Sequence, residues 1–235
     1  MITREQFCKM QDHALLRPYC KRQEVKKWCE EALKYGFASV CLNPCEVAYA
    51  KTIFGDRKGV GTVIGYPQGT NTTKTKIFES LDAIDNGADE LDVVMNISRF
   101  KEGDYEYVKN ELVEIVKAVK AKDPTVLVKV IFERTYLTEE EIPIIANIVL
   151  ESGADYIKEA TGYSPVGKTP DEGCGPEDIK LIKKVVGDRL KIKSAGGTNT
   201  LEDCIKVIEE GASRVGHVYI PMWLEEAGED FWKEK

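Results

Sequence analysis

The amino-acid sequence predicts an α/β protein that folds as a (β/α)8 barrel of the TIM type in a single domain. Short β-branched apolar runs alternate with longer amphipathic stretches along nearly the whole chain of 235 residues. Eight such units in this length fit a compact barrel better than an open, doubly wound sheet. A Rossmann-like sheet is the alternative fold, and it is disfavoured because no G-x-G-x-x-G sequence follows the first strands.

Eight apolar runs have the length and composition of buried strands. Their alternation with helical stretches indicates that the strands are parallel, because each strand then returns through a helix. The predicted strands are Asp12–Leu15, Ala38–Leu42, Val60–Tyr66, Glu90–Asn96, Val126–Glu133, Asp155–Lys158, Leu190–Ser194 and Arg214–Val218.

The stretches between these runs have the pattern of amphipathic helices, and a further helix is expected before the first strand. Thr138 and Thr200 have capping-box spacing to an acidic residue, and Pro176 suits a first helical turn. The predicted helices are Glu24–Tyr35, Thr73–Asn86, Tyr105–Lys122, Glu139–Ser152, Pro176–Val186, Leu201–Glu210 and Pro221–Lys235.

Three connections from a helix to the next strand have nearly the same sequence. They read Asn-Gly-Ala-Asp at 86–89, Ser-Gly-Ala-Asp at 152–155 and Glu-Gly-Ala-Ser at 210–213. Because no Pro/Gly/Ser-rich linker interrupts this pattern, residues 1–235 are predicted to form one barrel domain with an N-terminal helix. The aromatic-rich C-terminal segment, residues 221–235, is expected to pack on the barrel rather than to form a partner surface.

The composition indicates a cytoplasmic protein without a metal or a cofactor. The 33 Lys+Arg and 40 Asp+Glu residues give a net charge of −7, so nucleic acid is not expected as the main partner. No apolar run is long enough for a membrane span, and the N-terminus lacks the layout of a signal peptide. Seven cysteines without C-x-x-C spacing and two histidines suggest neither a disulfide framework nor a metal centre. The oligomeric state is left open, and a homo-oligomer is compatible with the sequence.

Side-chain alternation on the predicted strands places charged residues inside the barrel. In the fourth strand Leu91 and Val93 face the helices, so Asp92 faces the lumen, where an unpaired charge is costly. The same alternation directs Lys129 and Glu133 of the fifth strand inward.

Two further lysines end neighbouring strands. Lys158 and Lys193 are 35 residues apart, which is one βα unit, so their side chains are expected at similar height on adjacent strands. Repulsion and desolvation favour the neutral amine in one of them, and a neutral lysine is a nucleophile for carbonyl groups. The structural alternative is that these lysines reach solvent or pair with a carboxylate, and the spacing does not decide between the two.

Seven phrases around these residues occur collinearly from residue 12 to the end of the seventh strand. They are Asp12–Pro18, Gly36–Pro44, Thr62–Thr73, Gly87–Asn96, Leu127–Glu133, Gly153–Lys158 with Thr161 and Gly162, and Lys193–Gly197. In this order they resemble the deoxyribose-phosphate aldolase family, whose fold is a (β/α)8 barrel. The resemblance covers most of the chain and therefore supports the predicted fold.

The resemblance implies a class I aldolase, a carbon–carbon lyase that needs neither metal nor cofactor. Such an enzyme reversibly cleaves or condenses aldehydes, and its substrate would be a small aldehyde or sugar, phosphorylated or not. It implies that Lys158 forms the Schiff base, that Lys193 lowers the pKa of Lys158, and that Asp92 relays protons. The substrate-binding residues suggested in this way are Cys41, Lys129, Glu133, Thr161, Gly162, Gly196 and Gly197, with His217 as a compensating contact.

Departures from the family pattern leave the substrate open. The family's Lys-Thr-Ser-Thr-Gly-Phe reads Lys158-Glu-Ala-Thr-Gly-Tyr163 here, and the loop Ser164–Gly175 is longer than the family's. Val218 and Tyr219 follow the last strand where the family has small hydroxyl residues that help to hold the substrate phosphate. Half of the expected phosphate site is therefore missing, although the two glycines after the seventh strand are kept.

Three substrate classes and two further functions remain open from the sequence. A sugar phosphate could be held by His217, Lys168 or backbone amides, or Tyr163 and Tyr219 could pack against a bulkier, unphosphorylated aldehyde. A related reaction on another phosphorylated ketose is the third class. A non-catalytic metabolite-binding barrel is disfavoured because binding gains nothing from clustered like charges, and an isomerase because no complete phosphate loop is apparent.

Overall fold

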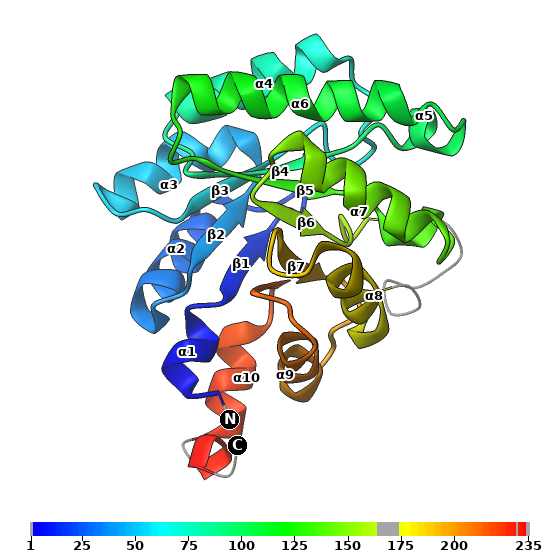
Figure 1. Cartoon of the computed structure of the whole chain (residues 1–235). Coiled ribbons are helices and arrows are strands. Elements are labelled where there is room, and N and C mark those ends of the chain that lie inside the picture. The colour runs from blue at the N-terminus through cyan, green and yellow to red at the C-terminus, as the bar shows by residue number, and fades with distance from the viewer. Residues whose placement is uncertain (1, 164–173, 229, 234–235) are drawn as a thin grey trace.

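The eight strands close into one parallel barrel in chain order (Figure 1), in a computed structural model that describes residues 2–163, 174–228 and 230–233. Each strand pairs with the next, and β8 pairs back with β1. The strands are β1 (Gln11–Leu15), β2 (Ser39–Leu42), β3 (Val60–Ile64), β4 (Glu90–Val94), β5 (Leu127–Ile131), β6 (Tyr156–Lys158), β7 (Lys191–Ala195) and β8 (Arg214–His217). The predicted (β/α)8 barrel is confirmed, and the alternative of a Rossmann-like sheet is wrong.

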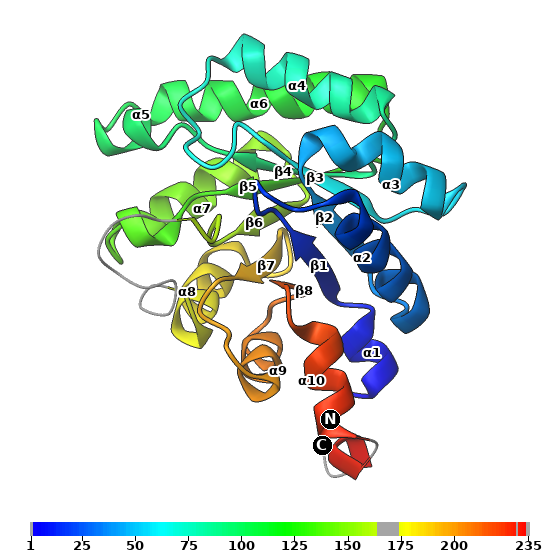
Figure 2. The ribbon, with the colours of Figure 1, turned by 180° about the vertical axis from the view of Figure 1, so that it is seen from behind.

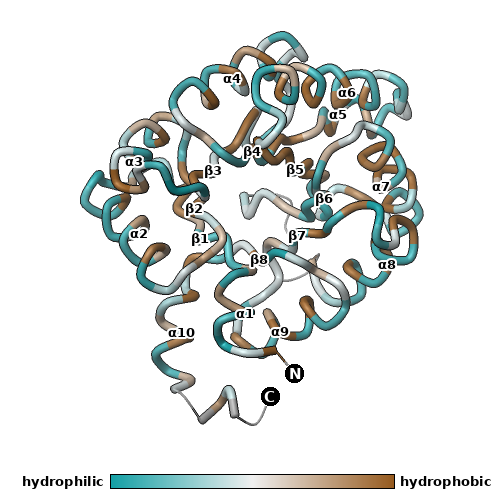
Figure 3. Tube along the Cα trace, turned by 60° about the vertical axis from the view of Figure 1, so that its left-hand side comes forward, coloured by the Kyte–Doolittle hydropathy of each residue, from teal (hydrophilic) through white to brown (hydrophobic). Residues whose placement is uncertain are grey.

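Helices surround the ring of strands (Figure 3). They are α1 (Arg4–Cys8), α2 (Arg22–Tyr35), α3 (Val47–Phe54), α4 (Thr73–Asp85), α5 (Ile97–Lys101), α6 (Tyr105–Lys122), α7 (Glu141–Ser152), α8 (Pro176–Val186), α9 (Leu201–Glu209) and α10 (Ile220–Ala227). Short 3-10 helices are η1 (Pro44–Glu46), η2 (Arg134–Tyr136) and η4 (Asp230–Lys233). Across the described ranges, none of the helices has the length and apolar character needed to span a membrane.

Two short helices, α3 and α5, lie in connections where the sequence pattern predicted none. α3 has eight residues and continues from the 3-10 turn η1, so its apolar positions are too few to show a clear period. α5 begins after Asn96, whose side-chain oxygen accepts the amide of Arg99 at 3.1 Å. The fourth strand therefore ends at Val94 and not at Asn96, since Asn96 caps a helix.

The predicted helix caps are correct at one site and only partly so at another. The Thr200 hydroxyl accepts the amide of Asp203 at 3.1 Å, as the capping-box spacing predicts. At Thr138 only half of the predicted capping box forms: the Glu141 carboxylate accepts the Thr138 amide at 2.8 Å, but the N-cap residue of α7 is Glu140 and the helix begins only at Glu141.

The described part of the C-terminal segment packs on the barrel. Trp223 and Leu224 of α10 belong to the hydrophobic core, and the ring of Trp232 lies 5.3 Å from that of Phe7 in α1. Figures 1 and 2 show α1 and α10 side by side. The last helix nevertheless ends at Ala227, because Gly228 turns the chain with a φ of 64°.

The hydrophobic core lies between the outer faces of the strands and the helices. Leu91 and Val93 of β4 are fully buried in it, and so are Val128 and Val130 of β5. The residues between them along each strand therefore point into the lumen, which is the arrangement that the sequence alternation predicts.

Candidate active site

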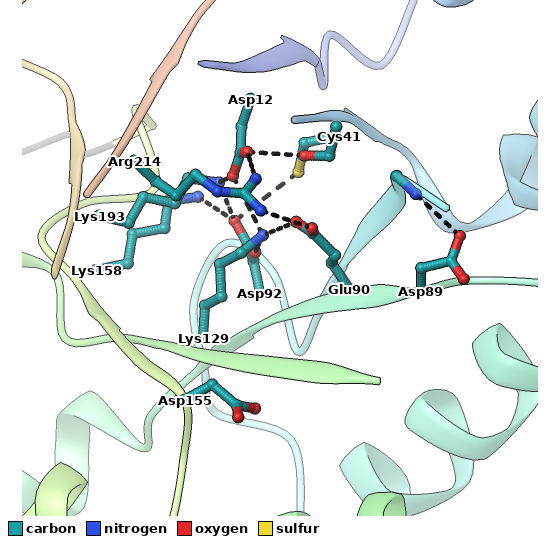
Figure 4. A network of polar contacts seen from close by, with 12 residues as sticks. Asp12, Cys41, Asp89, Glu90, Asp92, Lys129, Asp155, Lys158, Lys193 and Arg214 are labelled. Carbon is teal, nitrogen blue, oxygen red and sulfur yellow. Dashed lines mark hydrogen bonds and ion pairs between the residues drawn. The ribbon is translucent and has the colours of Figure 1, made fainter. Parts of the chain in front are cut away.

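The lumen of the barrel holds a buried cluster of charged side chains, four cationic and three acidic (Figure 4). Its members come from β1, β4, β5, β6, β7 and β8, and they form a continuous set of ion pairs. The residues are Asp12, Glu90, Asp92, Lys129, Lys158, Lys193 and Arg214. The cluster agrees with the rule that buried charges are paired.

Asp92 is the centre of the cluster. Its Oδ2 accepts from the amines of Lys158 and Lys193, each at 2.8 Å, and its Oδ1 accepts from Lys129 at 3.1 Å. Burial by itself raises the pKa of Asp92, but the three lysine charges outweigh burial and hold that pKa below its ordinary value. Asp92 is therefore ionised at neutral pH.

The two strand-end lysines differ in their surroundings although they are in register on β6 and β7. Burial and the charge of Lys193 lower the pKa of Lys158, against the opposing effect of Asp92. Burial also acts to lower the pKa of Lys193, but Asp12, 2.6 Å away, and Asp92 together raise it. Lys158 is thus the amine that gives up its proton more readily.

Four members of the cluster, Asp12, Glu90, Lys129 and Arg214, form its floor below the two strand-end lysines. Lys129 contacts Glu90 at 2.5 Å and Asp12 at 3.1 Å, and Arg214 binds both of these carboxylates. Burial raises the pKa of Asp12, and the surrounding cations reverse that effect and hold it well below its ordinary value. The floor therefore fixes the position of Lys193 from beneath.

Cys41 lies beside the cluster on β2. Its Sγ is 3.9 Å from Oδ2 of Asp92, and the side chain is almost fully buried. Burial, followed by the charge of Asp92, raises the pKa of this thiol to about 11. Cys41 is therefore a neutral, weakly polar part of the wall at neutral pH.

Glu133 and Thr161 link the segment that follows β5 to the segment that follows β6. Glu133 has a left-handed backbone with φ 55°, and its Oε2 accepts the amide of Thr161 at 3.0 Å and the Thr161 hydroxyl at 2.5 Å. The hydroxyl of Tyr66 donates to the carbonyl of Thr161 at 2.6 Å. These contacts fix the loop three residues after Lys158, where Gly162 turns with φ 83°.

A cavity of about 450 Å³ opens over the carboxyl ends of β3 to β6. Barrel enzymes of this type carry their active sites at this end of the strands. Its lining residues are Pro67, Gln68, Thr70, Ile97, Ser98, Glu133, Tyr136, Thr161 and Tyr163. Tyr66 stands between cavity and cluster. Its ring is 5.8 Å from that of Tyr163, and burial raises the pKa of its hydroxyl.

The comparisons with known proteins agree with this geometry. Residues 7–219 match the family model described as DeoC/LacD family aldolase. The chain belongs to this family. A curated deoxyribose-phosphate aldolase from Thermoanaerobacter sp. (strain X514) is 47% identical over 211 residues, which cover 89% of this chain and 92% of the relative. The one from Thermococcus gammatolerans is 43% identical and covers 87% and 89% respectively.

Solved structures give the same result. The structure named QR15, an aldolase, superposes with a TM-score of 0.83 at 38% identity and covers 97% of this chain and 96% of its own. The deoxyribose phosphate aldolase from Aeropyrum pernix, described as a tetramer, has a TM-score of 0.83 at 25% identity and covers 97% and 93%. The protein is therefore an aldolase, a lyase of the deoxyribose-phosphate aldolase type, and the readings as a binding barrel or an isomerase are set aside.

Of the residues that the sequence assigned to substrate binding, Glu133 and Thr161 line this cavity. Lys129 and His217 lie away from it, in other surroundings. Lys129 is fully buried in the floor, where carboxylates surround its amine. His217 shares the outer face of β8 with Val215, and its ring lies 4.4 Å from that of Trp223. The Nδ1 atom of His217 accepts the amide of Tyr219 at 3.1 Å. Both side chains are structural in this geometry.

The two glycines after β7 have a left-handed backbone conformation. Gly196 and Gly197 have φ values of 80° and 67°. A Cβ atom on Gly197 would lie 1.6 Å from the carbonyl oxygen of Cys174, so only glycine fits there. Tyr219 after β8 is 55% exposed, and Lys168 lies outside the described residues.

Four residues of the aldolase site escaped the sequence reasoning. Asp12, Glu90 and Arg214 complete the floor, and Tyr66 closes the wall. The signal for Glu90 was present, because it lies two positions before Asp92 on the same strand face. Among the described residues, no three His, Cys, Asp or Glu side chains are grouped as metal ligands.

Proposed function

We propose that this aldolase works through a Schiff base on Lys158 and that it cleaves and forms a deoxyribose phosphate. One observation carries the proposal: the Lys158 amine, with a lowered pKa, and the Lys193 amine both contact Asp92 at 2.8 Å at the carboxyl end of the strands. A buried amine whose pKa is lowered, next to an ammonium group held by carboxylates, has the properties of a carbonyl nucleophile with a proton donor beside it.

The first step joins enzyme and substrate. The neutral amine of Lys158 attacks C1 of the open-chain sugar, and the carbonyl oxygen leaves as water after it receives protons. Because the pKa of Asp92 is held low, Asp92 stays ionised and orients the two amines. Lys193, whose pKa is raised, carries the proton that the leaving water needs. The product is an iminium ion on Lys158.

The second step breaks the carbon–carbon bond. The C3 hydroxyl gives its proton to the Lys193 amine, which has lost its own proton to the leaving water, and the C2–C3 bond breaks. The electron pair of that bond moves into the iminium ion to give an enamine, and the Lys193 ammonium group then supplies the proton that the enamine takes up. The three-carbon aldehyde phosphate leaves, the enamine takes a proton at carbon, and water releases acetaldehyde from Lys158. Condensation is the reverse sequence. The buried site favours these charge shifts because its dipoles and charges are already in place.

The phosphate of the substrate is the second part of the proposal. The names of the relatives support it, and so do Gly196 and Gly197, which precede the N-terminus of α9 in the chain. A glycine loop before a helix N-terminus is a common phosphate site in barrels of this type. Cys41, Glu133, Thr161 and Gly162 are the residues proposed to line the remainder of the substrate site.

The setting of the enzyme is also proposed. All seven cysteines are free, which supports a reducing compartment and hence the cytoplasm, with a role in carbohydrate metabolism. A homo-oligomer is proposed because the Aeropyrum pernix protein is a tetramer and Phe78 on α4 is 73% exposed here. Light scattering after size-exclusion chromatography measures the state directly.

Trapping of the Schiff base tests the main proposal. Acetaldehyde followed by borohydride is expected to leave a stable secondary amine on Lys158, located by peptide mass spectrometry. Lys158→Ala removes the adduct, whereas Lys120→Ala, which changes an ion pair with Asp155 outside the cluster, keeps it. A wild-type protein without an adduct, or an adduct that persists in Lys158→Ala, overturns the proposal.

Relative kcat/KM values for 2-deoxyribose 5-phosphate and 2-deoxyribose test the phosphate. We expect the phosphorylated sugar to be preferred by about 10- to 100-fold, because hydrogen bonds to a charged group contribute about 1.5–3 kcal/mol. Equal values would overturn the phosphate part of the proposal and leave the Schiff base intact.

A further inference from the structure

A buried acidic side chain lies directly behind the two strand-end lysines. Glu159 follows Lys158 and Ser194 follows Lys193, so both point to the outer face of the strands while the lysines point inward. Ile157 and Ile192 on the same face belong to the hydrophobic core, and Glu159 itself has no exposed surface. The carboxyl group is thus enclosed between the barrel and the surrounding helices.

Glu159 joins three segments of the chain. The Ser194 hydroxyl donates to its Oε2 at 2.8 Å, and its own amide donates to the carbonyl of Lys193 at 3.4 Å. The Arg134 amide donates to the Glu159 carbonyl at 2.8 Å. Within the described ranges, no hydrogen-bond partner reaches Oε1. Glu159 therefore connects β6 to β7 at the level of the reacting amines.

The charged and titratable groups that face Glu159 come from two neighbouring elements and one connection. Asp178 is on α8, Arg134 is on η2, and Cys174 precedes α8. The Arg134 guanidinium is bound to Asp178 at 2.7 Å, so its charge is already paired. Burial dominates, and it raises the pKa of Glu159 to about 8.

We propose that Glu159 is a positioning residue, and that its hydrogen bond to Ser194 holds the ends of β6 and β7 in the register that brings Lys158 and Lys193 onto one carboxylate. The inference rests on the proposed function, because it concerns the alignment of the Schiff-base amine. The sequence supports a role particular to this chain, since the resembling family has threonine at this position.

The proposal has a consequence for the effect of pH on the reaction. At neutral pH the carboxyl group is protonated and the pocket carries no additional charge. Above pH 8 a carboxylate forms there. Burial opposes it more strongly than the hydrogen bonds from Ser194 and the Ala195 backbone and the charge of Arg134 favour it, so the charged form gains from opening of the pocket to water. Opening separates β6 from β7, and kcat falls because the two amines lose their alignment.

The experiment compares Glu159→Gln, Glu159→Ala and Ser194→Ala with wild type in steady-state aldol cleavage across pH 6–10. We expect kcat of wild type to fall above pH about 8, and this alkaline limb to be absent in Glu159→Gln, which cannot ionise. Glu159→Ala and Ser194→Ala, which remove the hydrogen bond, are expected to lower kcat at pH 7 by roughly 10- to 100-fold. KM is expected to change less, and Glu159→Gln restores most of the loss.

The outcomes separate this inference from the proposed function. An alkaline limb that persists unchanged in Glu159→Gln, or an unaltered kcat in Ser194→Ala, overturns the positioning role. Borohydride trapping of wild type then still supports the Schiff base on Lys158. A wild type that forms no adduct overturns both together. If Glu159→Ala does not fold, the Glu159→Gln pH profile and Ser194→Ala decide the question.

Discussion

The amines of Lys158 and Lys193 share one acceptor atom, Oδ2 of Asp92, and each lies 2.8 Å from it. Two ammonium groups so close together repel one another, and a single carboxylate oxygen compensates them only in part. The proton is therefore lost more readily from the amine that has no second carboxylate to stabilise its charge. That amine is Lys158, because Asp12 contacts Lys193.

Asp92→Asn is expected to lower kcat by at least 100-fold. The substitution removes the charge that orients both amines, and positioned acid–base groups contribute about 10²–10⁴-fold to a rate. Steady-state kinetics together with borohydride trapping measures the loss. The control is Asp155→Asn, which disrupts an ion pair with Lys120 outside the cluster and should leave kcat nearly unchanged. An Asp92→Asn enzyme with wild-type kcat contradicts the assigned role.

Lys193→Met is expected to raise the pKa of Lys158. Burial lowers this pKa first, Asp92 opposes the effect, and the charge of Lys193 lowers the pKa further. Removing that charge keeps the Lys158 amine protonated to a higher pH, so the acid limb of the rate of Schiff-base formation moves to higher pH. The pH dependence of the trapping rate, measured with acetaldehyde under single-turnover conditions, shows the shift. A limb that stays in place or moves to lower pH would refute the assigned coupling.

Side-chain alternation in the sequence predicted that Asp92 and the three lysines face the lumen. It did not identify the other floor residues, Asp12, Glu90 and Arg214. Leu91 and Val93 facing the helices determine that Asp92 faces the lumen, and the structure agrees. The same reasoning would have placed Glu90 inside. Asp12 and Arg214 were harder to assign, because they come from the first and last strands and meet only when the barrel closes.

The predictions that the structure does not support, and the residues that the sequence did not indicate, each have a specific physical cause. His217 was considered for substrate binding because a polar residue at a strand end is expected near the mouth. The side chain of His217 points to the same face of β8 as Val215, which lies in the hydrophobic core. The last strand is too short for its sequence to show which face is buried. Tyr66 lies beyond the end of β3, where strand alternation no longer determines direction. To predict the hydrogen bond between Glu159 and Ser194, one must know how β6 and β7 align. The number of residues between the two strands does not give that alignment.

Lys129→Ala is expected to destabilise the fold by about 3–5 kcal/mol, because it leaves buried carboxylates without their cation. Lys129 contacts Asp12, Glu90 and Asp92, all in the interior. Urea unfolding of Lys129→Ala and wild type measures the difference. Lys109→Ala is the matched control: it removes a half-exposed pair with Glu151, and exposed pairs contribute about 0–1 kcal/mol. Equal losses in the two variants would show that the floor is not a stabilising network.

Glu159 and Asp92 should affect thermal stability at opposite ends of the pH range. The pKa of Asp92 is depressed in the folded protein, so its stabilising contribution is complete above about pH 4 and is lost as the pH falls below that. Glu159 has a folded pKa of about 8 against an ordinary value of 4.5. The folded state therefore binds the additional proton between these values, and stability declines as the pH rises from 4.5 to 8.

Glu159→Gln separates the two effects because it removes only the second. The decline amounts to a few kcal/mol, since each pH unit between folded and unfolded pKa corresponds to about 1.4 kcal/mol. We expect the midpoint of thermal unfolding to rise by roughly 5–10 °C over wild type at pH 9 and by little at pH 5. Calorimetry at both pH values measures this difference. An increase of the same size at pH 5 would mean that the amide packs better than the acid, and that ionisation of Glu159 has no part in the effect.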